Sequence, residues 1–355
     1  MSSDTQHKKI LVAPLNWGLG HATRCIPIIN ALISYNYQPI LAGDGSSLEL
    51  LRQEFPGLGH YELPSTKVIY PEKGSSLKYK LLLQLPKLMK SVALEKKRVK
   101  EIHQLENLSG LISDNRFGVR SEGIPSIYIS HQIQVLSGNT STLSSRLHQQ
   151  IISQFTECWV PDFESNDLAG ELSKPGKAGL SLKYIEPLSR FKPQAQNKVW
   201  DIVAVLSGPE PQRSILEKKI REELSRYSGK SLLIQGLVGS KQTKRSEGNL
   251  TIVNFMLQQE LGQAIEQGKV ILSRSGYSSI MDLYALGAKA FLIPTPGQFE
   301  QEYLAKHLKQ NGYCDFSDQD SFNLEKLENM GNYQGLGHKK TSKNNLDRSL
   351  FDVFN

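Results

Sequence analysis

Two short stretches of the sequence combine glycines with side chains that can do chemistry. The first, NWGLGHATR (residues 16–24), follows the apolar run KILVAPL and places His21 directly after Gly18 and Gly20. An imidazole titrates near neutral pH and can accept a proton there, and glycines let the backbone approach a ligand closely. The stretch predicts His21 as a general base or a direct substrate contact, with a helix-capping or structural role as the alternative.

The same stretch nearly fits the dinucleotide-binding pattern G-x-G-x-x-G, with Thr23 at the position of the third glycine. Asp44, at the end of the second apolar run, lies at a plausible distance for a ribose ligand. A nicotinamide or flavin site and an ordinary turn therefore both stay open for this stretch. The motif SGKS (residues 228–231) does not complete a P-loop, since the first glycine of that loop would fall at Leu224.

The second stretch, ILSRSGYSSIMD (residues 271–282), reads as a strand, a polar turn over 274–276 and the start of a helix. Free N–H groups at a helix start suit a diphosphate, and a glycine there allows close approach. Asp282 lies one to two turns along the helix, placed to meet sugar hydroxyls. After a further strand and a PTPG turn come Gln301 and Glu302, near the start of another helix. Helix capping and solvated polar faces are the ordinary alternatives for each piece.

The elements that must position these stretches alternate along the whole chain, which predicts parallel sheets covered by helices. In the first half the expected strands are 10–13, 39–42, 111–113, 126–129 and 158–160. After a proline-containing linker over 186–199, the expected strands are 201–206, 231–234, 251–254, 270–272 and 290–293, and the expected helices are 212–227, 258–266, 278–286 and 300–311. We therefore predict two Rossmann-like α/β domains, 1–188 and 189–332, facing a cleft, and a polar tail over 333–355 with a short terminal helix. Ligands of such sheets bind at the carboxyl ends of the strands.

Composition narrows the class of protein. The 355 residues are 39% hydrophobic and 22% charged, which favours folded domains over a disordered chain. The three cysteines, Cys25, Cys158 and Cys314, are scattered and form no metal-binding spacing, so we expect a reduced compartment and no zinc site. No apolar run approaches 18 residues, and the N-terminus lacks the pattern of a signal peptide. The expected location is cytoplasmic.

The net charge of +7 is concentrated in one segment, since residues 77–101 hold eight Lys or Arg and two Glu. This segment lacks the interleaved aromatic residues of a single-strand binding groove, so we expect no nucleic acid partner. Its basic residues alternate with Leu, Met and Val, which indicates either contact with an anionic membrane or an ordinary helix with an apolar core face. Charge reversal at Lys78, Lys80, Lys87 and Lys90 would separate the two interpretations in a liposome sedimentation assay.

The constellation of the second half resembles the C-terminal domain of the GT-B glycosyltransferases of the MurG, or family 28, type, which build lipid-linked saccharides from UDP-sugars. The resemblance implies that the turn 274–276 holds the diphosphate, that Asp282 holds the ribose, and that Gln301 and Glu302 hold the donor sugar. The family has a second glutamine where Glu302 stands, which leaves the sugar open. The donor residues that the resemblance implies are Ser207, Gly208, Arg213, Phe255, Met256, Arg274, Ser275, Gly276, Asp282, Gln301 and Glu302.

The resemblance reaches the first half more weakly. GLGHATRCIPIINAL (residues 18–32) is similar to the family's first glycine-rich loop, whose histidine lies at the domain cleft, and SHQIQ (residues 130–134) is similar to a loop facing the acceptor. In SDNRFG (residues 113–118) Asp114 is the second catalytic candidate, as base or as the group that orients His21, with helix capping as the alternative. The acceptor or cleft candidates are Gly18, Gly20, Asn115, Arg116 and His131.

The resemblance implies an inverting transferase that moves N-acetylglucosamine or a related hexose from a UDP-sugar to an acceptor hydroxyl. We expect a reaction that needs no metal ion, because Arg274 and the oriented N–H groups would stabilise the charge on the leaving diphosphate. The acceptor is a saccharide or a lipid-linked molecule, which fits a peripheral position at the inner face of a membrane. Arg24 and Cys25 fit better the Gly-x-Gly-His-x-x-Arg-Cys loop of the UDP-sugar hydrolase of the pseudaminic-acid route, in which a histidine activates water. A non-catalytic nucleotide-sugar-binding protein or transferase subunit is the third alternative.

Overall fold

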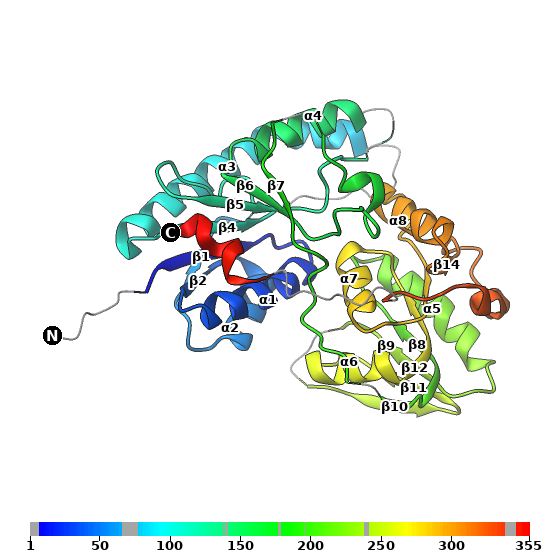
Figure 1. The fold of residues 1–355 in the computed structure, drawn as a ribbon. Coiled ribbons are helices and arrows are strands. Elements are labelled where there is room, and N and C mark those ends of the chain that lie inside the picture. Colours follow the sequence, from blue (N-terminus) through cyan, green and yellow to red (C-terminus); the bar gives the residue numbers. More distant parts are fainter. Residues whose placement is uncertain are drawn as a thin grey trace. The chain divides into compact units, whose positions relative to one another are not determined.

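The protein folds into two units, one of residues 1–188 with 343–355 and one of residues 189–342 (Figure 1). The computed structural model describes residues 7–65, 77–136, 138, 141–176, 179–194, 196–237, 241–337 and 346–355, with only the backbone over 77–88. Each unit is an α/β domain built on one seven-stranded sheet. The fold class predicted from the alternation of strands and helices is therefore confirmed.

The sheet of unit 1 is parallel throughout and has the strand order β3-β2-β1-β4-β5-β6-β7. Its strands are β1 (Lys9–Pro14), β2 (Gln38–Gly43), β3 (His60–Glu62), β4 (Gly110–Asp114), β5 (Ser126–Ile129), β6 (Glu157–Val160) and β7 (Leu182–Tyr184). Its helices are α1 (Gly20–Ser34), α2 (Gly45–Glu54), α3 (Leu77–Glu106) and α4 (Ser141–Ile152), with the 3₁₀ segments η2 (Gly170–Leu172) and η4 (Arg348–Phe354). The central strands are continuous apolar runs because helices cover both faces of the sheet.

The sheet of unit 2 has the order β10-β11-β9-β8-β12-β13-β14 and is parallel except for the β10–β11 hairpin. Its strands are β8 (Trp200–Val205), β9 (Ser231–Ile234), β10 (Lys244–Glu247), β11 (Leu250–Val253), β12 (Gly268–Ser273), β13 (Ala290–Leu292) and β14 (Asp315–Phe316). Its helices are α5 (Gln212–Ser225), α6 (Gln258–Gln267), α7 (Tyr277–Ala285), α8 (Phe299–Gln310) and the 3₁₀ segment η3 (Leu324–Asn332). Leu216, Ile220 and Leu224 repeat along α5 at helical spacing and pack into the buried core of this sheet.

The end of the chain belongs to unit 1, and the 3₁₀ segment η4 lies where a short terminal helix is expected in the tail 333–355. Phe351 and Phe354 are buried, and their ring centroids lie 5.7 Å and 6.4 Å from that of Trp159. A Cβ on Gly110 would lie 2.2 Å from the Phe354 ring, so only glycine fits under it. The apolar residues of the terminal LFDVF run therefore complete the core on the α1 side of the sheet (Figure 1).

Helix α3 carries the basic segment. The side chains of Lys78, Lys80 and Lys87 lie outside the described residues. In the following turns Lys90 is exposed, whereas Val99 and Ile102 pack into the core formed with β1, β2 and β4. The second half of the segment thus uses its apolar face as an ordinary amphipathic helix does. Within the described part of the chain, no helix is long and apolar enough to cross a membrane.

Candidate functional site

Three side chains of unit 1 converge on the carboxylate of Asp114. Asp114 is the last residue of β4 and pairs in register with Pro14, so the loop before α1 leaves the sheet beside it. His21 Nδ1 lies 2.9 Å from Asp114 Oδ1, and Arg24 Nε donates to Oδ2 at 2.5 Å. An Arg24 terminal nitrogen also donates to Oδ1, and the Cys25 thiol points at Oδ2 from 3.7 Å. The first turns of α1 and the end of β4 therefore build one polar cluster.

Burial and charge give the cluster a defined protonation. Asp114 is fully buried, and burial alone would raise its pKa, but the Arg24 guanidinium and His21 outweigh this and lower the pKa to about 2. The carboxylate is therefore ionised and can only accept, so His21 Nδ1 carries the proton and donates to it. The second ring nitrogen, Nε2, is then left as the basic atom. Burial and the nearby Arg24 charge lower the pKa of His21, which keeps Nε2 unprotonated at neutral pH.

The glycines before His21 shape the turn that exposes it. Gly18 has a φ of +72°, in the left-handed region where a side chain would be strained. Gly20 is the first residue of α1, and its carbonyl accepts from the Thr23 hydroxyl at 3.0 Å. His21 retains 16% of its side-chain exposure in this arrangement, whereas Asp114 has none. Solvent or a ligand can therefore reach the imidazole but not the carboxylate behind it.

The remaining unit 1 candidates fall into two groups. His131, in the loop after β5, is buried, and its charge acts on His21. Asn115 has a left-handed φ of +57° and accepts from the Tyr128 hydroxyl at 2.8 Å. Arg116, in contrast, points inward, as its guanidinium donates to Asp44 at 2.6 Å and lies 2.8 Å from Glu95. Arg116 thus connects the loop after β4 to α2 and α3. Its guanidinium faces these carboxylates and is not exposed to an acceptor substrate.

In unit 2, the candidate residues lie in the loops at the carboxyl ends of the strands or on the helices that follow these loops. Arg274 follows β12, is 1% exposed and donates to the carbonyls of Ile293 and Pro294 at 3.1 Å and 3.0 Å. It also donates to the carbonyl of Gln212 at 2.9 Å and to the side-chain oxygen of Gln319 at 2.7 Å. Arg274 therefore joins the turn before α7 to the start of α5 and to the segment after β13.

The charge of Arg274 is not compensated by a carboxylate. Among the described residues its guanidinium donates only to neutral oxygens, and its Nε is buried without a hydrogen-bond partner. Burial lowers its pKa to about 10, so the side chain is still a cation at neutral pH. A buried cation of this kind favours an anion close by.

The turn beside Arg274 leaves room for such an anion. Gly276 precedes α7, and a Cβ built on it would have nothing within 4 Å. The N–H groups of the first turn of a helix lack partners within that helix, and they carry the positive end of its dipole. The Ser275 hydroxyl instead faces inward and donates to the carbonyl of Gln301 at 2.8 Å. Open space at Gly276, the N–H groups of a helix start and a buried cation thus occur together in the turn before α7.

Asp282 lies on α7 and is held by a residue from the start of unit 2. The hydroxyl of Ser189 donates to Asp282 Oδ1 at 2.6 Å and also accepts from the backbone N–H of Phe191 at 3.1 Å. Burial raises the pKa of Asp282 to about 6, against the smaller opposing effects of Ser189 and the Arg190 charge. One carboxylate oxygen is therefore committed to Ser189, and the ionised form of the acid is incompletely stabilised.

Gln301 and Glu302 both hold the turn that precedes α8. The Gln301 side chain accepts from the N–H of Thr295 at 2.9 Å and donates to the Gln298 side chain at 2.6 Å. Glu302 accepts from the N–H of Gly297 at 3.0 Å. Both side chains are half-buried. They therefore shape the PTPG turn, and contact with a sugar would use their remaining donors and acceptors.

The loop after β8 carries the next three candidates. Ser207 and Gly208 are exposed, and a Cβ on Gly208 would meet nothing within 4 Å. Arg213, on the first turn of α5, is buried, and it is ion-paired with Glu210 and with Glu217, each at 2.6 Å. Its charge is already neutralised by two carboxylates. Within this loop the open backbone at 207–208 is available to a phosphate, and the Arg213 guanidinium is structural.

Phe255 and Met256 follow β11 and are half-buried. The side chain of Asn254 accepts from the N–H of Phe255 at 3.0 Å, and the side chain of Gln242 donates to the Phe255 carbonyl at 3.0 Å. Met256 lines a 240 Å³ hollow with residues of β10, β11 and α6. Side-chain amides thus hold the backbone of this loop. A nucleobase that binds the Phe255 backbone would have to replace or share these hydrogen bonds.

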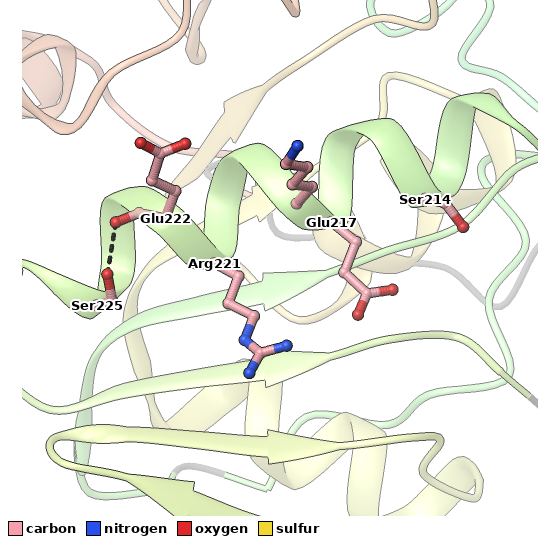
Figure 2. Close-up of a pocket in the computed structure, with 6 residues that line it drawn as sticks. Ser214, Glu217, Arg221, Glu222 and Ser225 are labelled. Carbon is pink, nitrogen blue, oxygen red and sulfur yellow. Dashed lines mark hydrogen bonds between the residues drawn. The ribbon is translucent and has the colours of Figure 1, made fainter.

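A larger hollow of 560 Å³ lies along α5 and is lined by Ser214, Glu217, Lys218, Arg221, Glu222 and Ser225 (Figure 2). Its charges are of both signs, and Glu217, Arg221 and Glu222 are ion-paired, with Arg221 2.6 Å from Glu247. It contains no residue predicted to bind a ligand. Within the described ranges no group of three or more His, Cys, Asp or Glu side chains could hold a metal ion.

The sequence does not reveal the residues that hold Asp114, Asp282 and Arg274 in place. Arg24 is noted only through the hydrolase pattern, and Ser189 and Gln319 are not singled out at all. The signal for Arg24 is that a charged residue stands beside Ala22 and Ile26 on the buried side of an apolar helix. Ser189 and Gln319 lie 93 and 45 residues from the groups they bind, and no local pattern marks them.

With this geometry in hand, comparison with known proteins gives a consistent result. Residues 209–345 match the family model of the glycosyltransferase family 28 C-terminal domain. The chain is 21% identical over 209 residues to the UDP-N-acetylglucosamine–N-acetylmuramyl-(pentapeptide) pyrophosphoryl-undecaprenol N-acetylglucosamine transferase of Haemophilus ducreyi. This match covers 57% of the chain and 56% of the relative, so the chain spans little more than half of that protein's length.

Longer matches reach both units. The transferase of the same name from Clostridium tetani is 22% identical over 352 residues, covering 97% of this chain and 94% of the relative. The crystal structure of Acinetobacter baumannii MurG superposes with a TM-score of 0.56 at 13% identity, covering 91% of this chain and 89% of that one. At this identity the superposition shows a shared fold.

Proposed function

We propose that this chain is a glycosyltransferase of the GT-B fold that transfers a hexose from a UDP-sugar to an acceptor hydroxyl, because residues 209–345 match the family 28 C-terminal domain and the fold is shared with MurG. N-acetylglucosamine or a close relative is the proposed sugar, since the relatives from Haemophilus ducreyi and Clostridium tetani are named for UDP-N-acetylglucosamine. The observation that carries the proposal is Arg274, a buried cation whose hydrogen-bond partners among the described residues are all neutral, in the turn before α7.

In this proposal the donor is held by unit 2. The diphosphate accepts from the first-turn N–H groups of α7 and lies in the field of Arg274, while Gly276 leaves the space it needs. Asp282 accepts from the ribose hydroxyls with the oxygen that Ser189 does not use. Ser207 and Gly208 add backbone donors, Phe255 and Met256 line the base, and Gln301 and Glu302 meet the sugar.

The chemical step then needs one base and one charge stabiliser. The acceptor oxygen attacks the anomeric carbon of the sugar, and its proton passes to Nε2 of His21. The bond from that carbon to the diphosphate oxygen breaks, and UDP leaves with its electrons. Arg274 and the α7 dipole stabilise the charge that develops on the diphosphate. We propose that this step needs no metal ion, so transfer should persist in EDTA.

The decisive experiment separates donor binding from chemistry. Thermal shifts with UDP-, GDP-, TDP- and CMP-sugars should show stabilisation by the UDP compounds, because a ligand that binds the native state raises the melting temperature. Arg274→Met should lose that shift. Arg221→Met is the matched control, because Arg221 is an exposed, ion-paired arginine of the same unit. No shift with any UDP compound, but a shift with NAD, would contradict the proposal and favour the dinucleotide interpretation.

Hydrolysis of the UDP-sugar is a second candidate, because Arg24 and Cys25 fit the hydrolase-like pattern and both contact Asp114 beside His21. In that reaction water replaces the acceptor hydroxyl and His21 takes its proton. Rapid release of UDP in the absence of any acceptor would favour hydrolysis. Release that depends on an added saccharide or lipid-linked saccharide would favour transfer.

We further propose that the acceptor is lipid-linked and that unit 1 meets it at an anionic membrane surface through the basic segment 77–101. Lys90 is exposed there, and the neighbouring Met89 is 71% exposed, which suits insertion between lipid headgroups. Charge reversal at Lys78, Lys80, Lys87 and Lys90 should abolish sedimentation with anionic liposomes. Charge reversal at Lys241 and Lys244, exposed in unit 2, is the control. Equal sedimentation of wild type and the 77–101 variant would contradict this.

A further inference from the structure

We propose that Arg24 is a positioning residue for the reaction, which fixes the Asp114 carboxylate and thereby the proton and the orientation of the His21 ring. This inference rests on the proposed function, because it presumes that His21 takes a proton from the acceptor or from water. Its evidence is separate, since it comes from the contacts among α1, β4 and the loop after β5.

The first step is the geometry of the guanidinium. Arg24 is 2% exposed, and it donates to both oxygens of Asp114, through Nε and through a terminal nitrogen. A planar guanidinium that binds a carboxylate in this two-bond manner fixes its plane as well as its position. Asp114 Oδ1 is the same oxygen that accepts from His21 Nδ1. The plane of the His21 ring is therefore set, through Asp114, by Arg24.

The second step is that Arg24 also faces His21 directly. Its terminal nitrogen lies 2.9 Å from His21 Nδ1. With the ionised carboxylate as the shared acceptor, both groups donate to Oδ1, and the guanidinium and Nδ1–H lie side by side. Protonation of the His21 ring would place a second positive charge next to that of the Arg24 guanidinium. Arg24 thus favours the neutral ring with its proton on Nδ1, which leaves Nε2 as the base.

The charged and titratable groups around His21 act in opposite directions. Asp114, from β4, favours the protonated ring, whereas Arg24, from α1, and His131, from the loop after β5, disfavour it. Cys25, the other α1 side chain at Asp114, has a pKa raised well above its ordinary value by burial and stays neutral. Removal of the Arg24 charge alone should therefore let the cluster take up its first proton at a higher pH.

The test is a titration of the His21 ring by NMR in the full-length chain, with its signal among the eight histidines identified by its loss in His21→Gln. In Arg24→Gln the midpoint should move to higher pH, and the acid limb of kcat/KM should move with it. Arg120→Gln is the control, because Arg120 of unit 1 binds Gln154 and not the Asp114 cluster. This variant should leave the midpoint of the His21 titration unchanged.

Arg24→Lys keeps the charge and loses the two-bond geometry. Its midpoint should stay near that of the wild type, while kcat/KM falls about 10²-fold or more because the ring is no longer held. A folded Arg24→Gln whose His21 midpoint is unchanged or lower would overturn the proposal. If Arg24→Gln does not fold, an Arg24→Lys variant with unchanged kcat/KM would overturn it instead.

The reaction and the role of Arg24 are tested by separate outcomes. If no UDP-sugar is turned over but the His21 midpoint rises in Arg24→Gln, the positioning role is right and the proposed reaction is wrong. If transfer is observed and the midpoint does not move, the reaction stands and Arg24 only supports the fold.

Discussion

Replacement of Asp282 by asparagine should stabilise unit 2 while it weakens nucleotide binding. The carboxyl is half-buried on α7, its Oδ1 accepts from Ser189 at 2.6 Å, and desolvation raises its pKa from 3.8 to about 6. An asparagine of the same shape keeps an oxygen to accept from Ser189 but never carries the charge. The variant therefore removes the carboxylate charge while it keeps the hydrogen bond from Ser189, so its effect on stability reports the charge alone.

The expected gain in the free energy of unfolding follows from the pKa of Asp282 in the unfolded chain and in the fold. The difference between 3.8 in an unfolded chain and about 6 in the fold is about 2, which corresponds to about 3 kcal/mol at about 1.4 kcal/mol for each pKa unit. This is the free energy that ionisation of Asp282 removes from the folded state. It is an upper value for the gain in Asp282→Asn, because the new amide N–H groups also need acceptors.

The direction of the pKa shift of Asp282 determines the pH range over which it affects stability. A folded-state pKa above the unfolded one means that the protonated acid favours folding, so this contribution is fully present below pH 3.8 and is lost as the pH rises through about 6. The stability of Asp282→Asn relative to wild type should thus be near zero at the acid end and reach its full value above pH 6. The affinity of the wild type for UDP should rise over the same window, because the ionised carboxylate is the better acceptor for ribose hydroxyls.

Hydrogen exchange measured by mass spectrometry on peptides that cover 270–286 reports the opening free energy of α7 within the whole chain. Isothermal titration with UDP measures the loss of affinity. The matched control is Asp201→Asn, because the hydrogen bond from Lys269 lowers the pKa of Asp201. That variant should be slightly destabilised at neutral pH and should bind UDP as the wild type does.

Two results would refute the reasoning. If Asp282→Asn exchanges faster than the wild type at pH 7.5, the charge is stabilised in the fold and the raised pKa is wrong. If it is more stable but binds UDP equally well, Asp282 is a buried acid without a role in the donor site.

Four further predictions address the other parts of the two sites. Gly276→Ala should fold normally, since its Cβ meets nothing within 4 Å, but should weaken UDP binding in titration calorimetry because the methyl group occupies the phosphate space. His21→Ala should lower kcat about 10²- to 10⁴-fold with UDP affinity unchanged, as measured by single-turnover kinetics and calorimetry. Ser189→Ala should reduce the affinity for UDP more than that for 2′-deoxy-UDP if Asp282 reads the ribose. Phe351→Ala should destabilise unit 1 by about 3 to 5 kcal/mol in hydrogen exchange of β6 peptides, because the ring is fully buried against Trp159.

The sequence predicts the central strands well because each is a short apolar run bounded by polar turns. Every strand expected from the alternation is present, with bounds shifted by at most two residues. Strands β3, β7, β10 and β14 are not predicted, since HYE, LKY, KRSE and DF are too short and polar to show a pattern. They lie at or next to the edges of the two sheets, where pairing, not burial, decides that the chain is extended.

The candidate sites are predictable to the level of loops and not to the level of contacts. The motifs identify the turns after β1, β4 and β12 because glycine and polar residues follow apolar runs there. Which side chains point into the fold is decided by the register of distant strands. Arg116 and Arg213 look alike in sequence as spare cations, yet carboxylates from other elements or the same helix neutralise both.

The charges of the two units differ in a way that fits their proposed roles. In unit 1 the arginines Arg24 and Arg116 are paired with carboxylates, and Asp114 has a pKa of about 2. In the described part of unit 2 the buried Arg274 donates to neutral oxygens, and the pKa of Asp282 is raised to about 6. The unit 1 cluster is thus electrostatically complete and suits a neutral reactant, a hydroxyl or water, whose proton it accepts. Among the described residues, the unit 2 site holds no counter-charge for Arg274 and one hydroxyl donor, Ser189, for Asp282. A nucleoside diphosphate would supply the counter-charge and further hydroxyl donors.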